Sequence, residues 1–361
     1  MKKKKKKAHS TAAVNSKLLR RPIKRFGWFF LFPMVGAFII GFVWPFIQGM
    51  YLSFCKFTAT SDAKVLGGEK FKDAMEFAAA NFGIPEGLNF FETIVAFFQE
   101  VGQYLSNFFI AFGDLMGEIF KNYERAFKDS QFMYSFGYTA LWTVVSVILI
   151  NVLAFVVAYA LTQSIKGTNI FRTVFFMPNL IGGIVLGYIW NMIFNGIFRY
   201  FNTDILRETR YGFWGLIILM LWQQVGYMMI IYVAGLQAVP EDMIEAAKID
   251  GANSWQTLTR ITIPNVMPSI TICTFLTLTN GFKLFDQNLA LTGGQPFQIN
   301  LTDGSAVHTT EMIALNIYNT FTESGPFAKG EAQAKAVLFF ILVASMGLLQ
   351  LKATRDKEVQ Q

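Results

Sequence analysis

The sequence predicts an all-α membrane protein with six transmembrane helices, and three observations support this: composition, six long apolar runs and the placement of basic residues. Of the 361 residues, 53% are hydrophobic and only 15% are charged, whereas soluble domains carry about 25% charged residues. A low charge content is expected when much of the surface faces lipid instead of water. The 39 phenylalanines suit lipid-facing and interfacial positions.

Six apolar runs come close to the length of about 20 residues that a bilayer-spanning helix requires. In chain order they cover residues 26–52, 136–161, 174–197, 213–236, 267–289 and 336–351. The first run follows a basic segment, as in a signal peptide, but it is long and lacks an Ala-x-Ala site, so we expect a retained anchor within residues 26–54. The fifth run is unusual because it contains Lys283 and Asp286.

Basic residues set the expected orientation through the positive-inside rule. The arm 1–25 is strongly basic, Lys166 and Arg172 flank the third run, and further cations lie in and just before the tail 353–361. Both termini and the loop 239–264 are therefore expected to be cytoplasmic in a bacterial cell membrane. A basic arm beside a first span favours contact with anionic membrane lipid over nucleic acid.

The segment 55–133 is expected to be an extracellular insertion. From about residue 88 to residue 120, phenylalanines recur at helical spacing and four acids interrupt the pattern. We expect one or two amphipathic helices, lying on the outer membrane face or packed on the spans. A seventh crossing is disfavoured because it would invert the topology of everything that follows. Two roles for the insertion remain as alternatives: contact with an extracellular binding protein and contact with the outer leaflet of the membrane.

The polar loop 239–264 predicts two short helices between the fourth and fifth runs. Pro240 and the acids after it suit the start of a helix that runs to about residue 249. Gly251 supplies a turn residue that tolerates positive φ. A second helix, from about residue 254 to 261, is expected to be capped by Asn253 or Ser254. Pro264 is expected to separate it from the following span.

The same loop carries a spaced motif. Its members are Glu245, Ala246, Ala247, Asp250, Gly251, Ile261 and Pro264. This spacing resembles the coupling-loop signature of ABC importer permeases, with Ile263 where that family usually has Leu. The resemblance extends over residues 120–352, for example in the Gly-Tyr pair 226–227 and the Leu-Thr-Gly-Gly run 291–294. The subfamily that the sequence resembles is that of the maltose- and glycerol-phosphate-type sugar importers. Within this subfamily it resembles the first of the two permeases (maltose F-like).

The resemblance implies an ABC type I importer permease fold and a set of partners. These are a second, homologous permease in a heterodimer, two ABC ATPase subunits that dock on the 239–264 loops, an extracellular solute-binding protein, and a sugar. No GxxxxGK[ST] phosphate-binding loop occurs in the sequence, so we expect ATP to bind to the partner ATPase and no cofactor to bind here. The two cysteines and two histidines are widely separated and predict no metal site.

Polar groups within the fourth and fifth runs are candidates for a substrate path, because such groups are costly in a membrane unless paired or hydrated. They and their neighbours are Trp222, Gln223, Gln224, Tyr227, Thr277, Asn280, Gly281, Lys283 and Asp286. Amides suit sugar hydroxyls because both donate and accept hydrogen bonds. Alternatively, these groups only bond one span to another, and Lys283 pairs with Asp286.

The sequence thus favours a sugar-importing permease subunit, not an enzyme. Two alternatives remain. The same machine could carry glycerol phosphate, a polyamine or an amino acid, although a phosphorylated solute would require more cations than Lys283. A membrane sensor or an intramembrane enzyme is disfavoured, since the spans show no nucleophile–base set and the tail is too short for a signalling domain.

Overall fold

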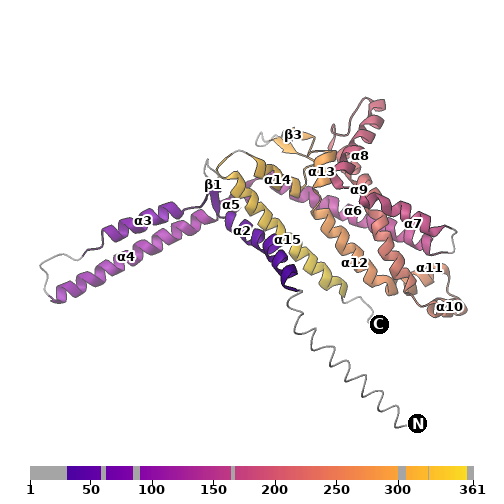
Figure 1. Ribbon diagram of the computed structural model, residues 1–361, viewed down its shortest axis with the longest axis horizontal. Helices are drawn as coiled ribbons and strands as arrows, with labels where there is room; N and C mark the ends of the chain where they lie inside the picture. The colour runs from indigo at the N-terminus through magenta and orange to yellow at the C-terminus, as the bar shows by residue number, and fades with distance from the viewer. Residues whose placement is uncertain are drawn as a thin grey trace, which may run out of the picture.

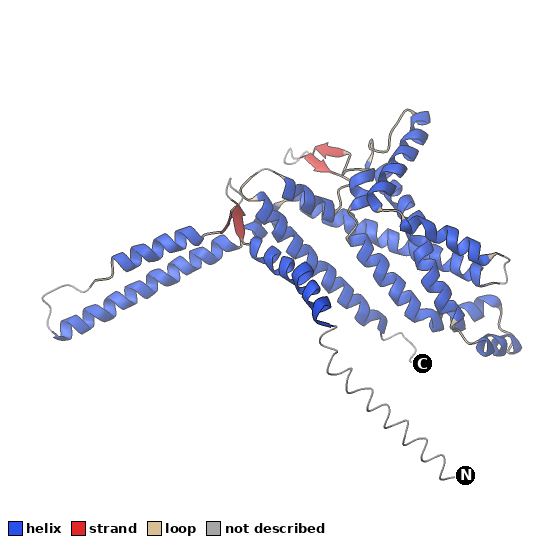
Figure 2. Cartoon of the chain, in the orientation of Figure 1, coloured by secondary structure: helices blue, strands red, loops and turns tan. Residues whose placement is uncertain are grey.

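The computed structural model describes residues 31–57, 62–83, 90–163, 167–299, 306–323 and 325–355. These residues are mostly helical, and the helices form an elongated bundle from which one helical pair projects (Figure 1, Figure 2). By length and composition, five of the described helices can cross a membrane, and a sharply bent pair brings the number to six when it is counted as one span. The all-α prediction with six spans is confirmed in this form. The basic arm, the start of the first predicted span and the last residues of the tail lie outside the described residues.

Four of the five unbroken spans are longer than the apolar runs that predict them, because polar turns extend each helix beyond its apolar part, and the first is described only from Leu31 onward. The five spans are Leu31–Leu52 (with the π-turn η1, Ile39–Val43, and α2, Trp44–Leu52), α6 (Ser130–Thr162), α9 (Thr209–Gln237), Ser254–Phe282 (α11, Ser254–Thr257; η4, Leu258–Thr262; α12, Ile263–Phe282) and α15 (Ala328–Arg355).

The third predicted span, residues 174–197, is not one straight helix. The chain forms α7 (Thr168–Phe176), the 3₁₀ turn η2 (Met177–Leu180) and α8 (Gly183–Phe198), with a bend of 100° between the two halves. Pro178 lies in the 3₁₀ turn, and Gly182 before α8 is extended, with φ −60° and ψ 140°. A proline and a pair of glycines at one place explain a break that a continuous apolar run does not reveal.

Close helix packing holds α8 after this break. Gly183 and Gly187 face α13 (Asp286–Leu291), where an added Cβ would come within 2.7 Å of Asp286 and 2.6 Å of Ala290. This four-residue spacing of glycines is typical of helices that approach closely in membranes. The Asn191 amide also donates to the Leu291 carbonyl at 2.7 Å. After α8, the turn η3 (Arg199–Phe201) leads toward α9.

The fifth span differs from its predicted bounds, 267–289, at both ends. Helical structure is continuous from Ser254 to Phe282, so the expectation that Pro264 separates the loop from the span is wrong. In the π-turn η4, the Ile263 amide donates to the Leu258 carbonyl, and Pro264 then occupies the first turn of α12, where a missing N–H is tolerated. At the other end, α12 stops before Lys283, so Lys283 and Asp286 are not inside a continuous span.

α6 and α9 form the centre of the bundle, and two clusters of buried side chains surround them. One includes Trp142 and Leu216, and the other includes Met228 and Tyr232. α7 crosses α9 so closely that an added Cβ at Gly226 would meet the Phe175 carbonyl oxygen at 1.8 Å. These contacts fix both halves of the bent span against α9.

The two ends of the bundle carry different elements. α10 (Glu241–Ile249), α11 and the C-terminal end of α15 lie at one end, and α13, α14 (Ile313–Thr322) and the hairpin of β3 (Phe297–Ile299) and β4 (Ala306–His308) lie at the other (Figure 1). This arrangement agrees with a shared side for the tail and the 239–264 loop.

The insertion also starts at the α13–α14 end. It contains a second hairpin, β1 (Cys55–Phe57) with β2 (Ala63–Val65), followed by α3 (Gly68–Ala80), α4 (Phe90–Ile119) and α5 (Lys121–Lys128). The predicted amphipathic helices are therefore present. They do not pack on the spans, because α3 and α4 pair with each other and extend away from the bundle (Figure 1).

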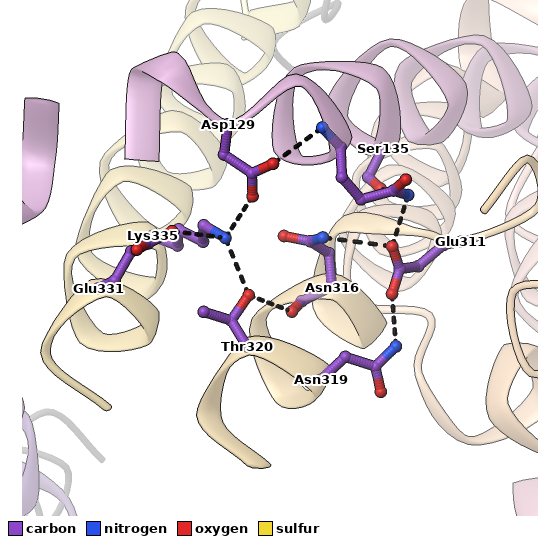
Figure 3. A network of polar contacts seen from close by, with 9 residues as sticks. Asp129, Ser135, Glu311, Asn316, Asn319, Thr320, Glu331 and Lys335 are labelled. Atoms are coloured by element: carbon purple, nitrogen blue, oxygen red, sulfur yellow. Dashed lines mark hydrogen bonds and ion pairs between the residues drawn. The ribbon is translucent and has the colours of Figure 1, made fainter. Parts of the chain in front are cut away.

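A buried ammonium group ties three helices together at this end (Figure 3). Lys335 of α15 is 1% exposed, and its Nζ lies 2.6 Å from Asp129 Oδ2, 3.1 Å from Glu331 Oε1 and 2.8 Å from Thr320 Oγ1. Asp129 also caps α6 by accepting from the Gln131 backbone N–H at 2.9 Å. One cation thus joins the start of α6, the end of α14 and the first turns of α15.

A second buried charge lies beside the first. The Glu311 carboxylate is 2% exposed and accepts amide hydrogen bonds from Gln131 at 2.5 Å, Asn316 at 3.2 Å and Asn319 (Figure 3). Acidic side chains outnumber basic ones around Lys335 and Glu311. Burial raises the pKa of Glu323 above its usual value, and the carboxylates of Glu331, Asp129 and Glu311 raise it further, although Lys335 acts in the opposite direction.

Replacing Lys335 is expected to destabilise the protein strongly. Lys335→Met leaves two partly buried carboxylates without their cation, a change that costs about 3 kcal/mol and lowers the melting temperature by about 5–10 °C. The measurement is thermal unfolding in detergent. Lys128→Met is the control, because its ion pair with Glu124 is exposed and contributes little. Equal melting temperatures for the two variants would contradict this role for Lys335.

Candidate functional site

The first helix of the 239–264 loop has the bounds that the sequence predicts. α10 begins after Pro240 and ends at Ile249, and Gly251 follows with φ +79°. The Gly251 amide donates to the Lys248 carbonyl at 3.1 Å, and the Ala252 amide donates to the Ala247 carbonyl at 2.9 Å. These two bonds form a Schellman motif, which satisfies the last carbonyls of the helix and turns the chain sharply.

The second helix is capped by Asn253, as expected. Its side chain accepts from the Gln256 backbone N–H at 2.8 Å, and the Gln256 side chain accepts from the Asn253 backbone N–H at 2.9 Å. This reciprocal capping box fixes the start of the helix. Because α11, η4 and α12 are continuous, the loop is rigidly joined to the fifth span.

A hollow of about 560 Å³ lies between the two loop helices. Of the predicted coupling residues it is lined by Ala246, Ala247, Asp250, Gly251 and Ile261, together with Met243, Ala252, Gln256 and Arg260. Glu245 is exposed and, by the 3.6-residue repeat, lies on the opposite side of α10. Pro264 does not line the hollow either. The structure therefore brings five of the seven residues together and leaves two outside.

Large apolar side chains around this hollow are exposed. Ile249 is 85% exposed and Trp255 is 71% exposed. Arg260, which lines the hollow, is exposed as well. Isolated exposed apolar residues are ordinary, but an aromatic anchor beside a small-residue hollow and an arginine has the composition of a protein interface.

A second candidate site lies inside the bundle, between α6, α9 and α12. This chamber contains about 190 Å³ of empty space divided among the side chains, which leaves no room for a water molecule between the described residues. Its lining combines four predicted residues, Gln224, Thr277, Asn280 and Gly281, with Trp142, Ser146, Ile150 and Met220. The spans would have to separate before a solute could enter.

Two polar atoms at this chamber are buried without a hydrogen-bond partner among the described residues. They are Gln224 Oε1, an acceptor, and Trp142 Nε1, a donor. An unsatisfied buried polar group costs about 1–3 kcal/mol, so such groups are uncommon in a purely structural contact. A donor and an acceptor at one narrow chamber can bind a hydroxyl group when the spans open.

Other predicted residues bond one helix to another. The Gln223 amide donates to the Ile181 carbonyl at 3.3 Å and accepts from Gln287 at 2.8 Å, which ties α9 to the break after η2 and to α13. Thr277 both lines the chamber and accepts from Asn151 at 2.9 Å. Asn151 in turn accepts from Tyr232 at 2.7 Å, so α6, α9 and α12 are bonded in one chain.

The remaining predicted residues lie away from the chamber. Trp222 is half-exposed and packs edge-on against Trp190, with ring centroids 5.7 Å apart. Tyr227 contacts Phe176. Lys283 and Asp286 are both exposed. Among the described residues, no ion pair joins these two side chains.

The contribution of α6 to the chamber is absent from the sequence prediction. Trp142 and Ser146 lie in a run that looks uniformly apolar. A signal was nevertheless present, because the polar residues Ser135, Thr139, Thr143 and Ser146 recur every three or four positions along one face. All four are buried, which marks this as the inward face of α6.

Comparison with known proteins identifies the family to which part of this sequence is similar. Residues 150–351 match the family described as "Binding-protein-dependent transport system inner membrane component". This match covers more than half of the chain and includes the 239–264 loop, α9 and α12.

Three relatives are similar over about two thirds of the chain. The probable starch degradation products transport system permease protein AmyD of Thermoanaerobacterium thermosulfurigenes is 42% identical over 248 residues, covering 66% of this chain and 81% of its own. The multiple sugar-binding transport system permease protein MsmF of Streptococcus mutans is 32% identical with the same coverage. The trehalose/maltose transport system permease protein MalF of Thermococcus litoralis is 29% identical, covering 65% and 79%.

A solved structure shares the fold. A chain of a bacterial ABC transporter involved in the import of the acidic polysaccharide alginate superposes with a TM-score of 0.62 and 16% sequence identity. The superposition covers 94% of this chain and 98% of that chain. The fold is therefore that of ABC importer membrane subunits.

Two adjacent glutamines are expected to differ in their effect on stability. Gln223→Met removes the hydrogen bonds to Ile181 and Gln287, so it is expected to cost about 1–3 kcal/mol. Gln224→Met removes an amide oxygen that has no partner among the described residues, so stability should stay unchanged or rise. Thermal unfolding in detergent measures both. A larger loss for Gln224→Met would show that Gln224 has a structural role instead.

Proposed function

Because the chain belongs to the binding-protein-dependent transport system inner membrane component family, we propose that it forms half of a translocation pore for a neutral sugar or oligosaccharide. A separate ATPase drives this pore through the 239–264 loop. The chain is an integral membrane component of a transport system and not an enzyme. The solute, the partner subunits and the orientation in the membrane belong to the proposal.

The lining of the chamber is the observation that favours a neutral sugar as the solute. Its lining contains two amides, an indole N–H and two hydroxyl groups, and among the described residues no charged side chain lines it. Sugar hydroxyls donate and accept hydrogen bonds, which matches the unpartnered Gln224 oxygen and Trp142 nitrogen. A phosphate, a polyamine or a zwitterionic amino acid would require a charged partner in so dry a place.

The names of the relatives support the same substrate class. They are associated with starch degradation products, multiple sugars, and trehalose or maltose. The structure related by fold alone belongs to an importer of an acidic polysaccharide, and another of that type holds a periplasmic protein with bound alginate pentasaccharide. A binding protein that delivers solute to the α13–α14 end is consistent with this family.

The loop supports coupling to an ATPase. Its exposed aromatic and aliphatic residues, Trp255 and Ile249, flank a hollow lined by small residues. The end of α10 is fixed by the Schellman motif and the start of α11 by the capping box, so a push on the loop would move both helices as one body. In this proposal each ATPase of a pair docks on one permease loop, and the termini share the cytoplasmic side with it.

A second permease completes the pore. α9 exposes a stripe of large apolar side chains on the face away from the chamber: Trp214, Ile218, Trp222 and Ile230. Such a stripe suits either lipid or another helical subunit. The relatives are individual permease proteins of transport systems, which is consistent with a heterodimer.

Transport assays test the substrate class. Proteoliposomes containing the complex that co-purifies with the tagged chain are expected to accumulate labelled maltooligosaccharides or trehalose when ATP and the binding protein are present. Gln224→Met should lower uptake about five- to tenfold, because one hydrogen bond in a dry site is worth about 1–1.5 kcal/mol. Val144→Ala, exposed on the face of α6 that is turned away from the chamber, should leave uptake unchanged.

Two results would contradict the proposal. Uptake of glycerol phosphate, spermidine or an amino acid in place of sugars would show that the substrate class is wrong. Sugar uptake that survives Gln224→Met would show that the chamber is not on the solute path.

A further inference from the structure

Helix α4 packs on α3 with only one of its apolar faces. The positions that face α3 include Phe108 and Glu118: the Phe108 ring contacts Phe71 of α3 edge-on, with centroids 6.1 Å apart, and Glu118 accepts from Lys70 of α3 at 3.2 Å. A helix in a soluble pair would be expected to expose a polar face on the sides that its partner does not cover. α4 instead has a second apolar face that stays exposed.

The uncovered face of α4 is strongly apolar. It carries Phe98, Leu105, Phe109 and Phe112, which recur at helical spacing and are all exposed, Phe98 and Phe109 each to 67%. The acids Glu100, Asp114 and Glu118 project from the opposite side of the helix by the 3.6-residue repeat. A 30-residue helix of this kind presents a stripe about 45 Å long.

The direction of the helical pair indicates what this stripe contacts. α3 and α4 leave the α13–α14 end of the bundle and run across the direction of α2 and α15, not along it (Figure 1). α4 lies on the side of the pair toward which the spans extend, and α3 lies on the far side (Figure 1). Tyr104 of α4 contacts Phe82, just after α3. By the 3.6-residue repeat, Phe98 and Phe109 lie about a third of a turn from Tyr104, so the stripe borders the side of α4 that is turned toward the level of the membrane.

The stripe is also continuous with a surface that lies in the membrane. The first span is exposed along its apolar length, for example at Phe38 and Trp44. Phe54, directly after this span, contacts Phe120 at the base of α4 edge-on, with ring centroids 5.8 Å apart. Phe120 is exposed and lies in line with the stripe. Aromatic side chains thus connect the end of the first span to the base of α4.

We propose that α4 is an interfacial helix that lies along the bilayer surface, with Phe98, Leu105, Phe109 and Phe112 inserted among the lipid acyl chains. Helices of this type bury the apolar face about 5–10 Å into the boundary between headgroups and chains. In the proposed orientation this is the outer leaflet. α3 then lies on the water side and covers the acidic side of α4.

The charge of the pair separates this proposal from a purely electrostatic attachment. The polar sides of α3 and α4 carry seven acids (Glu69, Asp73, Glu76, Glu92, Glu100, Asp114 and Glu118) and two lysines (Lys70 and Lys72). Attraction to anionic lipid is therefore absent, and insertion depends on apolar area alone. Attachment should consequently be insensitive to the fraction of anionic lipid and to salt.

Site-directed spin labelling tests the proposal on the full chain. Phe109→Cys and Gln103→Cys are labelled separately in the complex reconstituted in nanodiscs, and collision with oxygen, which concentrates in lipid, is compared with collision with a water-soluble nickel chelate. Gln103 is exposed on the same helix, about a third of a turn away. Cys55 and Cys273 are buried, and the unsubstituted protein supplies their labelling background.

The expected result is an oxygen-to-nickel collision ratio several-fold higher at position 109 than at position 103. High nickel accessibility at both positions would overturn the proposal, because the stripe would then face water. Protection of position 109 from both reagents would also overturn it and would assign the stripe to a protein partner, such as the binding protein. Leu105→Cys, on the same face, provides a second variant if the first does not assemble.

Discussion

The buried Lys335 ammonium is the interaction on which the arrangement of the bundle depends. It joins α15 to the cap residue of α6 through Asp129 and to the end of α14 through Thr320. α6 is distant in sequence from α14 and α15, and apolar helix surfaces alone would leave the relative position of such helices weakly specified. The buried Lys335 ammonium favours one relative position of the helices, since any other position of the helices would leave a charge buried without a partner. The adjacent Glu311 network extends the same constraint to Gln131 and the β3–β4 hairpin.

Because the Lys335 network fixes one end of the bundle, a movement of the 239–264 loop at the other end can be transmitted along the spans. α9 and α12 both line the chamber, and they enter the 239–264 loop directly, α9 at Gln237 and α12 through its continuous junction with α11. Gln224 lies 13 residues from the end of α9, or about 20 Å along the helix. A displacement of the loop by a docked ATPase would therefore separate or close the chamber walls without refolding any span. The dry, unsatisfied state of Gln224 and Trp142 is what a closed form of such a chamber would show.

Local features were predictable from the sequence, and features that depend on distant contacts were not. The bounds of α10, the left-handed Gly251 and the Asn253 cap followed from neighbouring residues alone. The bend at Pro178 was missed because the apolar run continues through it and the glycines that hold α8 act by meeting α13. Gln223 and Gln224 look equivalent in the sequence, since only the packed structure shows that the Gln223 amide has partners and that the Gln224 oxygen has none among the described residues. Lys335 lay just outside the predicted last span, and its partner Asp129 is more than 200 residues away.

The central claim is that the 239–264 loop receives the force of a separate ATPase, and photo-crosslinking tests it most directly. A photoreactive phenylalanine analogue replaces Trp255 in the tagged chain, and the complex is irradiated in native membranes. Tyr200, 89% exposed in η3 at the far end of α8, is replaced in the control. The account predicts a covalent product with an ABC ATPase subunit from position 255 and none from position 200. An ATPase that co-purifies with the chain but crosslinks at neither position, or at position 200 instead, would contradict it.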